Sequence, residues 1–227
     1  MHLSSVAAFG FELGDDVDES HPVRPNRNPY VDTKVASEQV VLQAHAAGEV
    51  ECSIVRPTDV YGPGSRPWTV LPVEMLRSGR LLLPAGGKGV LSPVYVENLI
   101  DGLEAVAASD AAAGQVFTIG DGSSLAARDF FGYYGRMLGG APVRTLPTPV
   151  AKGIAALVKT GFDLVGRETE VSVETMRMLA RDGGYSIGKA RRLLGYEPRI
   201  GLEEGMRRTE RWLRSEGLLG DDGRRGR

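Results

Sequence analysis

The stretch ECSIVRPTDVYGPG, at residues 51–64, predicts a buried strand that runs into a turn rich in glycine and proline. Its first part, Glu51–Arg56, is short and apolar, and the following Thr58–Pro67 is typical of a loop. Upstream, Tyr30–Ala47 has the apolar spacing of an amphipathic helix, and His2–Ser5 predicts another short strand. A strand, a helix and a second strand in this order favour a parallel, doubly wound α/β sheet.

The alternation continues downstream, but from Leu81 onward the elements shorten and helices become more frequent. Further strands are expected at Arg80–Pro84, Pro93–Val96, Gln115–Ile119 and Val143–Leu146. Further helices are expected at Val70–Ser78, Glu97–Ala108, Ala126–Leu138, Pro149–Val165, Val171–Ala180, Ser186–Leu194 and Leu202–Glu216. We therefore expect one domain over residues 1–80 and a mainly helical substrate-side lobe over residues 81–216, some of whose elements return to the sheet. Residues 217–227 are expected to form a frayed, disordered tail.

The composition is that of a globular protein. Of the 227 residues, 42 % are hydrophobic and 25 % are charged, so a sizeable core can form. The 27 basic residues nearly balance the 29 acidic ones, which disfavours a nucleic-acid partner held by bulk charge. With one cysteine, Cys52, and three scattered histidines, neither a disulfide framework nor a metal site is expected. The start of the chain lacks a secretion signal and no apolar run is long enough to span a membrane, so we expect a cytoplasmic protein.

The stretch YVDTK, at residues 30–34, carries the most informative chemistry. Tyr30 and Lys34 are four residues apart, which places them on one face of a helix and one turn from each other. An ammonium group beside a phenol favours the phenolate form, and such a tyrosine can act as a general base near neutral pH. Taken alone, the pair is a weak signal, because two surface side chains on an ordinary helix are the commoner explanation of this spacing.

Further motifs give the pair a context. Residues 4–10, SSVAAFG, stand at a strand end, and RPTDVYGPG at residues 56–64 follows the next strand. Near the carboxyl end, YSIGKARRLLGYEP occupies residues 185–198. In this combination the chain resembles the extended short-chain dehydrogenase/reductase superfamily, and within it the NAD-dependent epimerase/dehydratase group. Two mild departures from the family pattern are Phe9 for tyrosine and Thr33 for serine.

The resemblance implies a Rossmann-like fold and a role for each matching residue. Tyr30 would exchange a proton with the substrate hydroxyl, Lys34 would assist Tyr30 and bind the nicotinamide ribose, and Ser5 would hold the substrate oxygen. The nicotinamide ring would be lined by three residues after the second strand, namely Pro57, Thr58 and Val60. The implied cofactor is NAD or NADP, which carries the hydride.

The family's glycine-rich dinucleotide fingerprint is expected well upstream of the catalytic serine, but only four residues precede Ser5. Gly86–Gly89 joins two short strands, and Gly132 and Gly135 fall inside a predicted helix. A phosphate cradle needs glycines at a strand-to-helix turn, so these clusters do not replace the fingerprint. We therefore expect a Rossmann-like sheet without its first strands, and a chain from which the pyrophosphate- and adenosine-binding half is absent. Such a chain would be active only if that half is supplied.

Two positions bear on the substrate. Dehydratases of this family that act on nucleotide sugars carry Asp-Glu where this chain has Val6 and Ala7. Nucleotide-sugar members often carry an arginine at the position of Leu91. The following PVYVENLIDG, at residues 93–102, instead resembles the 3β-hydroxysteroid and sterol dehydrogenase branch. We therefore predict oxidoreduction between a secondary alcohol and a ketone on a hydrophobic, sterol-like small molecule.

Two alternatives stay open, a nucleotide-sugar epimerase or dehydratase of the same superfamily, and an inactive remnant that acts as a binding protein. The apolar segment at residues 150–165 could cap a hydrophobic substrate or touch a membrane surface weakly, or it could be ordinary core. The resemblance also implies a homodimer, in which Val35–Gln43 of the Tyr30–Ala47 helix would form part of the interface.

Overall fold

The computed structural model describes residues 1–14, 16–164 and 173–220. It divides into two compact units that interleave along the chain. Unit 1 comprises Met1–Val60, Ser92–Ser124 and Asp182–Leu202, and unit 2 comprises the intervening segments and the residues from Glu203 onward. The predicted division at residue 80 stays a prediction, and the predicted tail lies largely outside the described residues.

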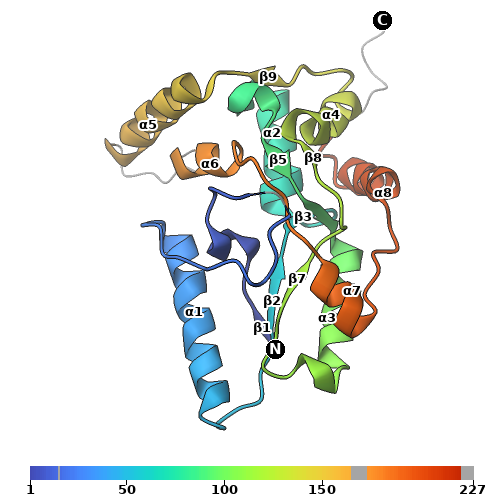
Figure 1. The fold of residues 1–227 in the computed structure, drawn as a ribbon. Helices are drawn as coiled ribbons and strands as arrows, with labels where there is room; N and C mark the ends of the chain where they lie inside the picture. The colour runs from blue at the N-terminus through green and yellow to red at the C-terminus, as the bar shows by residue number, and fades with distance from the viewer. Residues whose placement is uncertain (15, 165–172, 221–227) are drawn as a thin grey trace, which may run out of the picture. The chain divides into compact units, whose positions relative to one another are not determined.

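Unit 1 is built on a parallel sheet of three strands, in the order β1-β2-β7. The strands are β1 (His2–Leu3), β2 (Ile54–Pro57) and β7 (Val116–Ile119) (Figure 1). Because successive side chains of a strand point to opposite faces, Val55 and Arg56 serve different layers. This parallel α/β arrangement confirms the predicted fold class.

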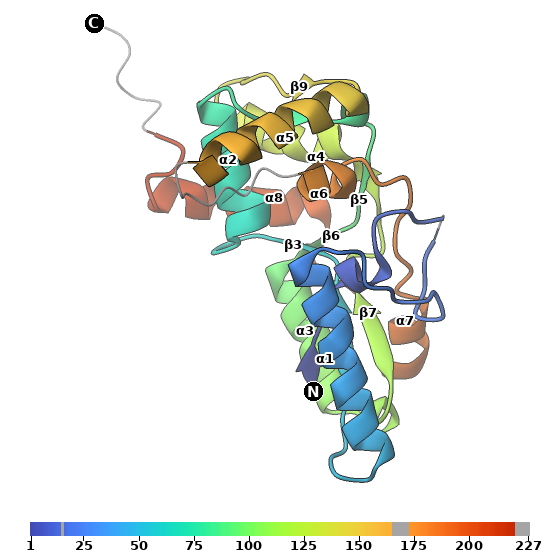
Figure 2. The same ribbon diagram turned by 90° about the vertical axis from the view of Figure 1, so that its left-hand side faces the viewer.

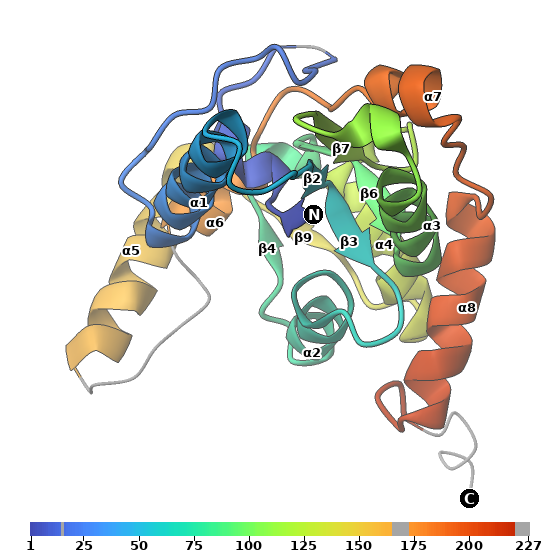
Figure 3. The same ribbon diagram turned by 90° about the horizontal axis from the view of Figure 1, so that it is seen from below.

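Helix α1 (Pro29–Ala46) connects β1 to β2 and lies on one side of the sheet (Figure 3). The Asn28 side chain caps it by accepting hydrogen bonds from the backbone N–H groups of Tyr30 and Val31, at 3.0 and 3.1 Å. Pro29 stands at the first helical position, where a missing N–H costs nothing. The inner face of α1 buries Val31 and Val35.

The other side of the sheet is covered by α3 (Val96–Ala107) and α7 (Gly188–Leu194) (Figure 3). Their apolar side chains pack on Val55 and Phe117 of the sheet. The buried members of this core are Val55, Val94, Leu99, Val106, Ala112, Phe117, Ile119, Ile187, Ala190 and Tyr196. Unit 1 therefore has the three-layer order of a doubly wound fold.

Unit 2 is mainly helical, with two small strand pairs. The strands β4 (Leu82–Leu83) and β9 (Arg144–Thr145) are parallel, and β5 (Val90–Leu91) and β8 (Leu125–Ala126) are antiparallel. The helices are α2 (Leu71–Arg77), α4 (Ala127–Met137), α5 (Thr148–Leu164), α6 (Val173–Met178) and α8 (Leu202–Ser215). Helices α5 and α6 lie side by side (Figures 1 and 2). Phe130, Phe131 and Tyr134 of α4 are buried packing residues.

Some short elements escaped the sequence prediction. Val6–Phe9 forms a 3-10 turn, η1, directly after β1. Asp59–Tyr61, predicted as loop, is strand β3, which pairs with β6 (Pro93–Tyr95). The backbone N–H of Asp59 donates to Ser92 O at 3.0 Å, a contact between residues far apart in sequence. Elements this short carry no periodic pattern, so only their long-range pairing defines them.

Two glycines of α4 provide a matched test of the packing in unit 2. A Cβ at Gly135 would lie 2.6 Å from the backbone oxygen of Ala141, whereas at Gly132 the nearest atom is 3.7 Å away. Gly135→Ala is expected to lower the free energy of unfolding by about 1–3 kcal/mol through overpacking. Gly132→Ala is expected to raise it by about 0.5–1 kcal/mol, because alanine is the better helix former. Urea denaturation of both variants measures the difference, and equal effects would contradict the close approach at Gly135.

Candidate active site

The first turns of α1 bring the predicted tyrosine and lysine together. Lys34 Nζ lies 5.8 Å from the centroid of the Tyr30 ring, so the ammonium faces the aromatic ring across one helical turn. Tyr30 is 57 % exposed, which leaves its hydroxyl open to an incoming molecule. Lys34 is half-buried. The pair therefore has one accessible member and one that the fold holds in place.

Lys34 also ties the helix to the strand that precedes Ser5. Its Nζ donates a hydrogen bond to the backbone oxygen of Leu3 at 2.9 Å. Two residues later, the half-buried Ser5 caps the η1 turn, where its Oγ accepts from the N–H of Ala7 at 3.1 Å. Because the hydroxyl acts there as an acceptor, its own proton stays available to a substrate oxygen.

Three of the predicted cofactor residues lie at the carboxyl end of β2 or just after it, where α/β sheets bind ligands. Pro57 is the last residue of β2, and the Thr58 N–H donates to Ile119 O at 3.0 Å. Thr58 Oγ1 is buried and has no hydrogen-bond partner within the described part of the chain. The half-buried Val60 lies on β3 and packs against the core beneath α3.

These residues fit the nicotinamide-ribose half of a dinucleotide. The Lys34 ammonium has three donors, of which the structure gives one to Leu3. Thr58 adds a hydroxyl that lacks a partner among the described residues and stands next to Gly120, where a Cβ would meet Thr58 Oγ1 at 2.9 Å. A polar group of a ligand at this strand end would satisfy the hydroxyl.

The glycine clusters lie where the sequence predicted them. Gly86 and Gly87 belong to the short 3-10 turn Ala85–Gly87, while Gly132 and Gly135 lie inside α4. None of these four glycines opens a helix at the end of a strand, which is the geometry a pyrophosphate requires. They are turn and helix residues, as predicted.

Asp121, just beyond the carboxyl end of β7, escaped the sequence analysis. Its carboxylate accepts hydrogen bonds from the Tyr95 N–H at 3.1 Å and from Asn98 Nδ2 at 2.7 Å. Burial raises the pKa of Asp121 to about 6, although these two hydrogen bonds oppose the rise. No sequence signal marked Asp121, because its environment is set by long-range contacts. Its partner Asn98 is itself buried, and the Asn98 side-chain oxygen also accepts from the N–H of Ile200.

A pH dependence of stability follows from Asp121. Because its pKa is about 6 in the folded state and 3.8 ordinarily, the folded state retains a proton between these values that the unfolded chain releases. Its contribution of about 2–3 kcal/mol is therefore complete below about pH 4 and is lost as the pH rises through about 6. In Asp121→Asn this part of the slope should vanish when the free energy of unfolding is measured against pH. An unchanged slope would contradict the assignment.

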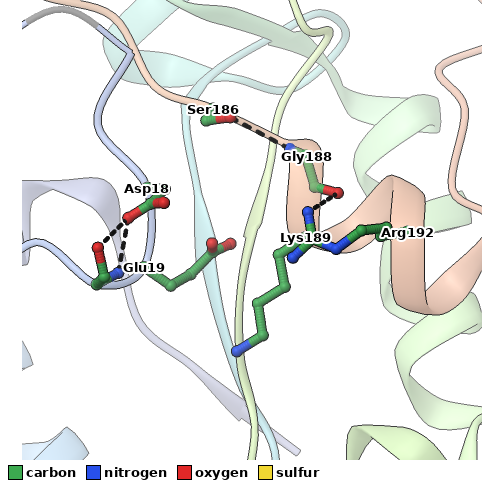
Figure 4. A pocket seen from close by; sticks show the side chains of 7 residues that line it. Asp18, Glu19, Ser186, Gly188, Lys189 and Arg192 are labelled. Carbon is green, nitrogen blue, oxygen red and sulfur yellow. Dashed lines mark hydrogen bonds between the residues drawn. The ribbon is translucent and has the colours of Figure 1, made fainter.

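A polar pocket of about 360 Å³ lies in unit 1 (Figure 4). None of the predicted site residues lines it. Glu19 accepts a hydrogen bond from the N–H of Thr118 at 2.6 Å, and burial lowers the pKa of Lys189, with Arg56 and Arg192 acting in the same direction. The lining residues are Asp18, Glu19, Ser20, Ser186, Gly188, Lys189 and Arg192. Because two carboxylates and two cations line it, the pocket favours neither an anionic nor a cationic ligand.

Comparison with known proteins agrees with the observed fold. The model of the NAD dependent epimerase/dehydratase family matches residues 1–120. Since this is more than half of the chain, the protein belongs to that family.

Individual relatives carry several activities. The chain is 29 % identical to 2-alkyl-3-oxoalkanoate reductase of Stenotrophomonas maltophilia over 80 % of this chain and 57 % of that one. It is 32 % identical to 3-beta-hydroxysteroid dehydrogenase of Mycolicibacterium neoaurum, over 85 % and 56 %. Among solved structures, the dTDP-glucose 4,6-dehydratase DesIV of Streptomyces venezuelae, with NAD and TYD bound, superposes with a TM-score of 0.70 at 26 % identity. That match covers 95 % of this chain and 60 % of DesIV.

The chain thus spans about three-fifths of the length of each of these three proteins. Within the described ranges, no helix combines the length and the apolar character needed to cross a membrane.

Proposed function

We propose that the protein is an NAD(P)-dependent oxidoreductase that interconverts a secondary alcohol and a ketone. The observation that carries the proposal is the Tyr30–Lys34 pair, whose lysine is hydrogen-bonded to the strand that leads into Ser5. Family membership and the sequence similarity to dehydrogenases and reductases support it. When bound, the nicotinamide supplies the hydride acceptor or donor.

The chain's own residues would transfer the proton and hold the substrate oxygen. The exposed Tyr30 hydroxyl would take the proton of the alcohol, or return it to the ketone. Lys34 would stabilise the ionised phenol and offer its remaining donors to the ribose. Ser5 would donate its hydroxyl proton to the substrate oxygen and so hold the reacting carbon in place. Pro57, Thr58 and Val60 would border the nicotinamide.

A hydrophobic, sterol-like substrate is the best-supported class. Leu91, at the position where nucleotide-sugar relatives often have arginine, is fully buried and cannot present a charge. Three apolar residues of α5, Val150, Ile154 and Leu157, are exposed by 48 %, 38 % and 75 % and could cover such a substrate. The same face could make weak contact with a membrane surface. The alternative substrate is a nucleotide sugar, which the similarity to DesIV, a dTDP-glucose 4,6-dehydratase, supports.

Activity would require the pyrophosphate- and adenosine-binding part of the cofactor site, which we place outside residues 1–227. The glycines of the turn Ala85–Gly87 and of helix α4 lie in turns and helices that are unsuited to that task. The choice between NAD and NADP rests with the same part. If that part is never supplied, the alternative of an inactive binding protein applies.

Two further proposals concern the setting of the enzyme. A homodimer through α1 would use Val40, which is 65 % exposed, whereas Val35 is buried inside unit 1 and unavailable. The single free cysteine, Cys52, accords with a reducing compartment, so we place the protein in the cytoplasm.

A direct assay tests the proposed function. The form that the native source produces is purified, and its intact mass and first residue are determined. It is then incubated with NAD or NADP and either a 3β-hydroxysteroid or a nucleoside diphosphate sugar. We expect reduced nicotinamide to accumulate with the steroid alone. Accumulation or epimerisation with the sugar alone would favour the epimerase/dehydratase alternative, and no cofactor binding would favour the remnant.

A further inference from the structure

A buried carboxylate continues the stripe that carries the tyrosine and lysine. Tyr30, Lys34 and Glu38 follow one another at intervals of four residues along α1, so they lie on one face of the helix. Their environments differ sharply, because Tyr30 is 57 % exposed whereas Glu38 is 1 % exposed. The stripe therefore begins in solvent and ends beneath the helix, against the sheet.

Glu38 joins α1 to both strands that lead into the proposed site. Arg56 of β2 donates to its two oxygens, from Nε at 2.9 Å and from Nη2 at 2.6 Å. The Ser4 hydroxyl, directly after β1, donates to the first of these oxygens. Ser4 and Arg56 are themselves buried, with exposures of 4 % each. One carboxylate thus holds three separate elements together.

Each partner of Glu38 is a direct neighbour of a proposed site residue. Ser4 precedes Ser5, and Arg56 precedes Pro57. The Arg56 guanidinium also stacks on the ring of Phe9 in η1, at 4.5 Å from the ring centroid. Any movement of the carboxylate would therefore displace the end of β2, the turn η1 and helix α1.

Directional hydrogen bonds fix the position of α1 on the sheet more tightly than apolar packing does. The buried side chains that join α1 to η1 by apolar contact are small, namely Ala8, Val31 and Val35, with Ala7, Phe11 and Val23 packed partly buried against them. Non-directional contacts of this kind resist rotation or sliding of the helix less strongly than hydrogen bonds do. A bidentate carboxylate–guanidinium pair fixes both the distance and the plane of its partners. Buried ion pairs are weak sources of net stability but can specify one arrangement over its neighbours.

We propose that Glu38, together with Ser4 and Arg56, is a positioning device that sets Tyr30 and Lys34 opposite Ser5. This inference rests on the proposed function for its catalytic meaning. Glu38 is a positioning residue, because its carboxylate is hydrogen-bonded to Ser4 and Arg56 and would act on the substrate through other residues. Loss of the device would leave a folded protein in which the Tyr30 hydroxyl is slightly displaced relative to the Ser5 hydroxyl.

The first test needs no turnover. The protein is labelled with 3-fluorotyrosine, and the Tyr30 resonance is assigned by its absence from Tyr30→Phe. We expect the Tyr30 signal to move by more than its linewidth in Ser4→Ala and in Glu38→Gln. Asn98→Ala, a control that also removes buried hydrogen bonds of unit 1, should leave the signal in place. An unmoved signal in both device variants would overturn the proposal.

The second test separates positioning from stability. In the active form, Ser4→Ala should lower kcat about 10–100-fold, the loss expected of a slight misplacement, with KM for the alcohol changed by less than about twofold. The double variant Glu38→Met/Arg56→Met should recover the thermal midpoint that either single change loses, yet keep the low kcat. Recovery of wild-type kcat in the double variant would overturn the positioning role.

The two tests fail separately. A Tyr30 signal that moves as expected, in a protein without nicotinamide turnover, would uphold the positioning device and remove the proposed function. If the protein is active but its Tyr30 signal and kcat are unchanged by substitution of Ser4 and Glu38, the proposed function would stand and the positioning device would be removed.

Discussion

Replacing Tyr30 with phenylalanine is expected to lower turnover of a secondary alcohol by about 10²–10⁴-fold, the range that a lost general acid–base accounts for. The change removes one hydroxyl from a side chain that is 57 % exposed, so the fold should be unaffected. The ring stays beside Lys34, whose Nζ lies 5.8 Å from its centroid. The measurement is the initial rate of nicotinamide reduction, with cofactor affinity determined in parallel.

Tyr133→Phe is the matched control, because it deletes the same atom from a tyrosine in unit 2. Its hydroxyl donates to Glu203 on α8. Both residues belong to unit 2, whereas the proposed catalytic residues belong to unit 1. Turnover in this variant should equal that of the wild type. If Tyr30→Phe also turned over at the wild-type rate, Tyr30 would not be the acid–base residue.

Replacing Arg56 with methionine is expected to lower the free energy of unfolding by about 3–5 kcal/mol. Methionine fills the space of the aliphatic stem but leaves Glu38 buried without its cationic partner. The side chains of Arg56 and Glu38 are 5 % and 2 % exposed, so water cannot take the place of the guanidinium. Chemical denaturation monitored by far-ultraviolet circular dichroism measures the loss.

The corresponding change on the surface is Arg214→Met. Arg214 and Glu210 form an i,i+4 pair on α8, with side chains 42 % and 34 % exposed. Such pairs contribute about 0–1 kcal/mol, so this variant should unfold close to the wild-type midpoint. Equal losses in the two variants would mean that the buried pair is solvated and has no special part in the fold.

Much of unit 1 was predictable because local signals agreed with one another. The helix at Tyr30 begins with an asparagine cap and a proline at its first position, and the structure starts it one residue earlier, at Pro29. The strand predicted at Gln115–Ile119 is observed at Val116–Ile119. Apolar side chains, caps and breakers all act within a few residues, so they can be read without knowing what the segment contacts.

The supports of the site were not predictable in the same way. Glu38 and Arg56 are 18 residues apart, and each alone is typical of a solvated surface. Their pairing exists only because β2 returns beside β1 with α1 across one side of both. Asp121 likewise takes its raised pKa from burial and not from any neighbouring sequence signal. Chemistry that depends on long-range burial has to be found in the structure.

The central claim is that Ser5, Tyr30 and Lys34 serve hydride transfer between a hydrophobic secondary alcohol and a nicotinamide. Its most direct test uses a 3β-hydroxysteroid with deuterium on the carbinol carbon, incubated with oxidised cofactor and the protein from its native source. Mass spectrometry should find the deuterium on the reduced nicotinamide, and the transfer should disappear in Tyr30→Phe. Cofactor that binds but gains no deuterium from any secondary alcohol would contradict the claim.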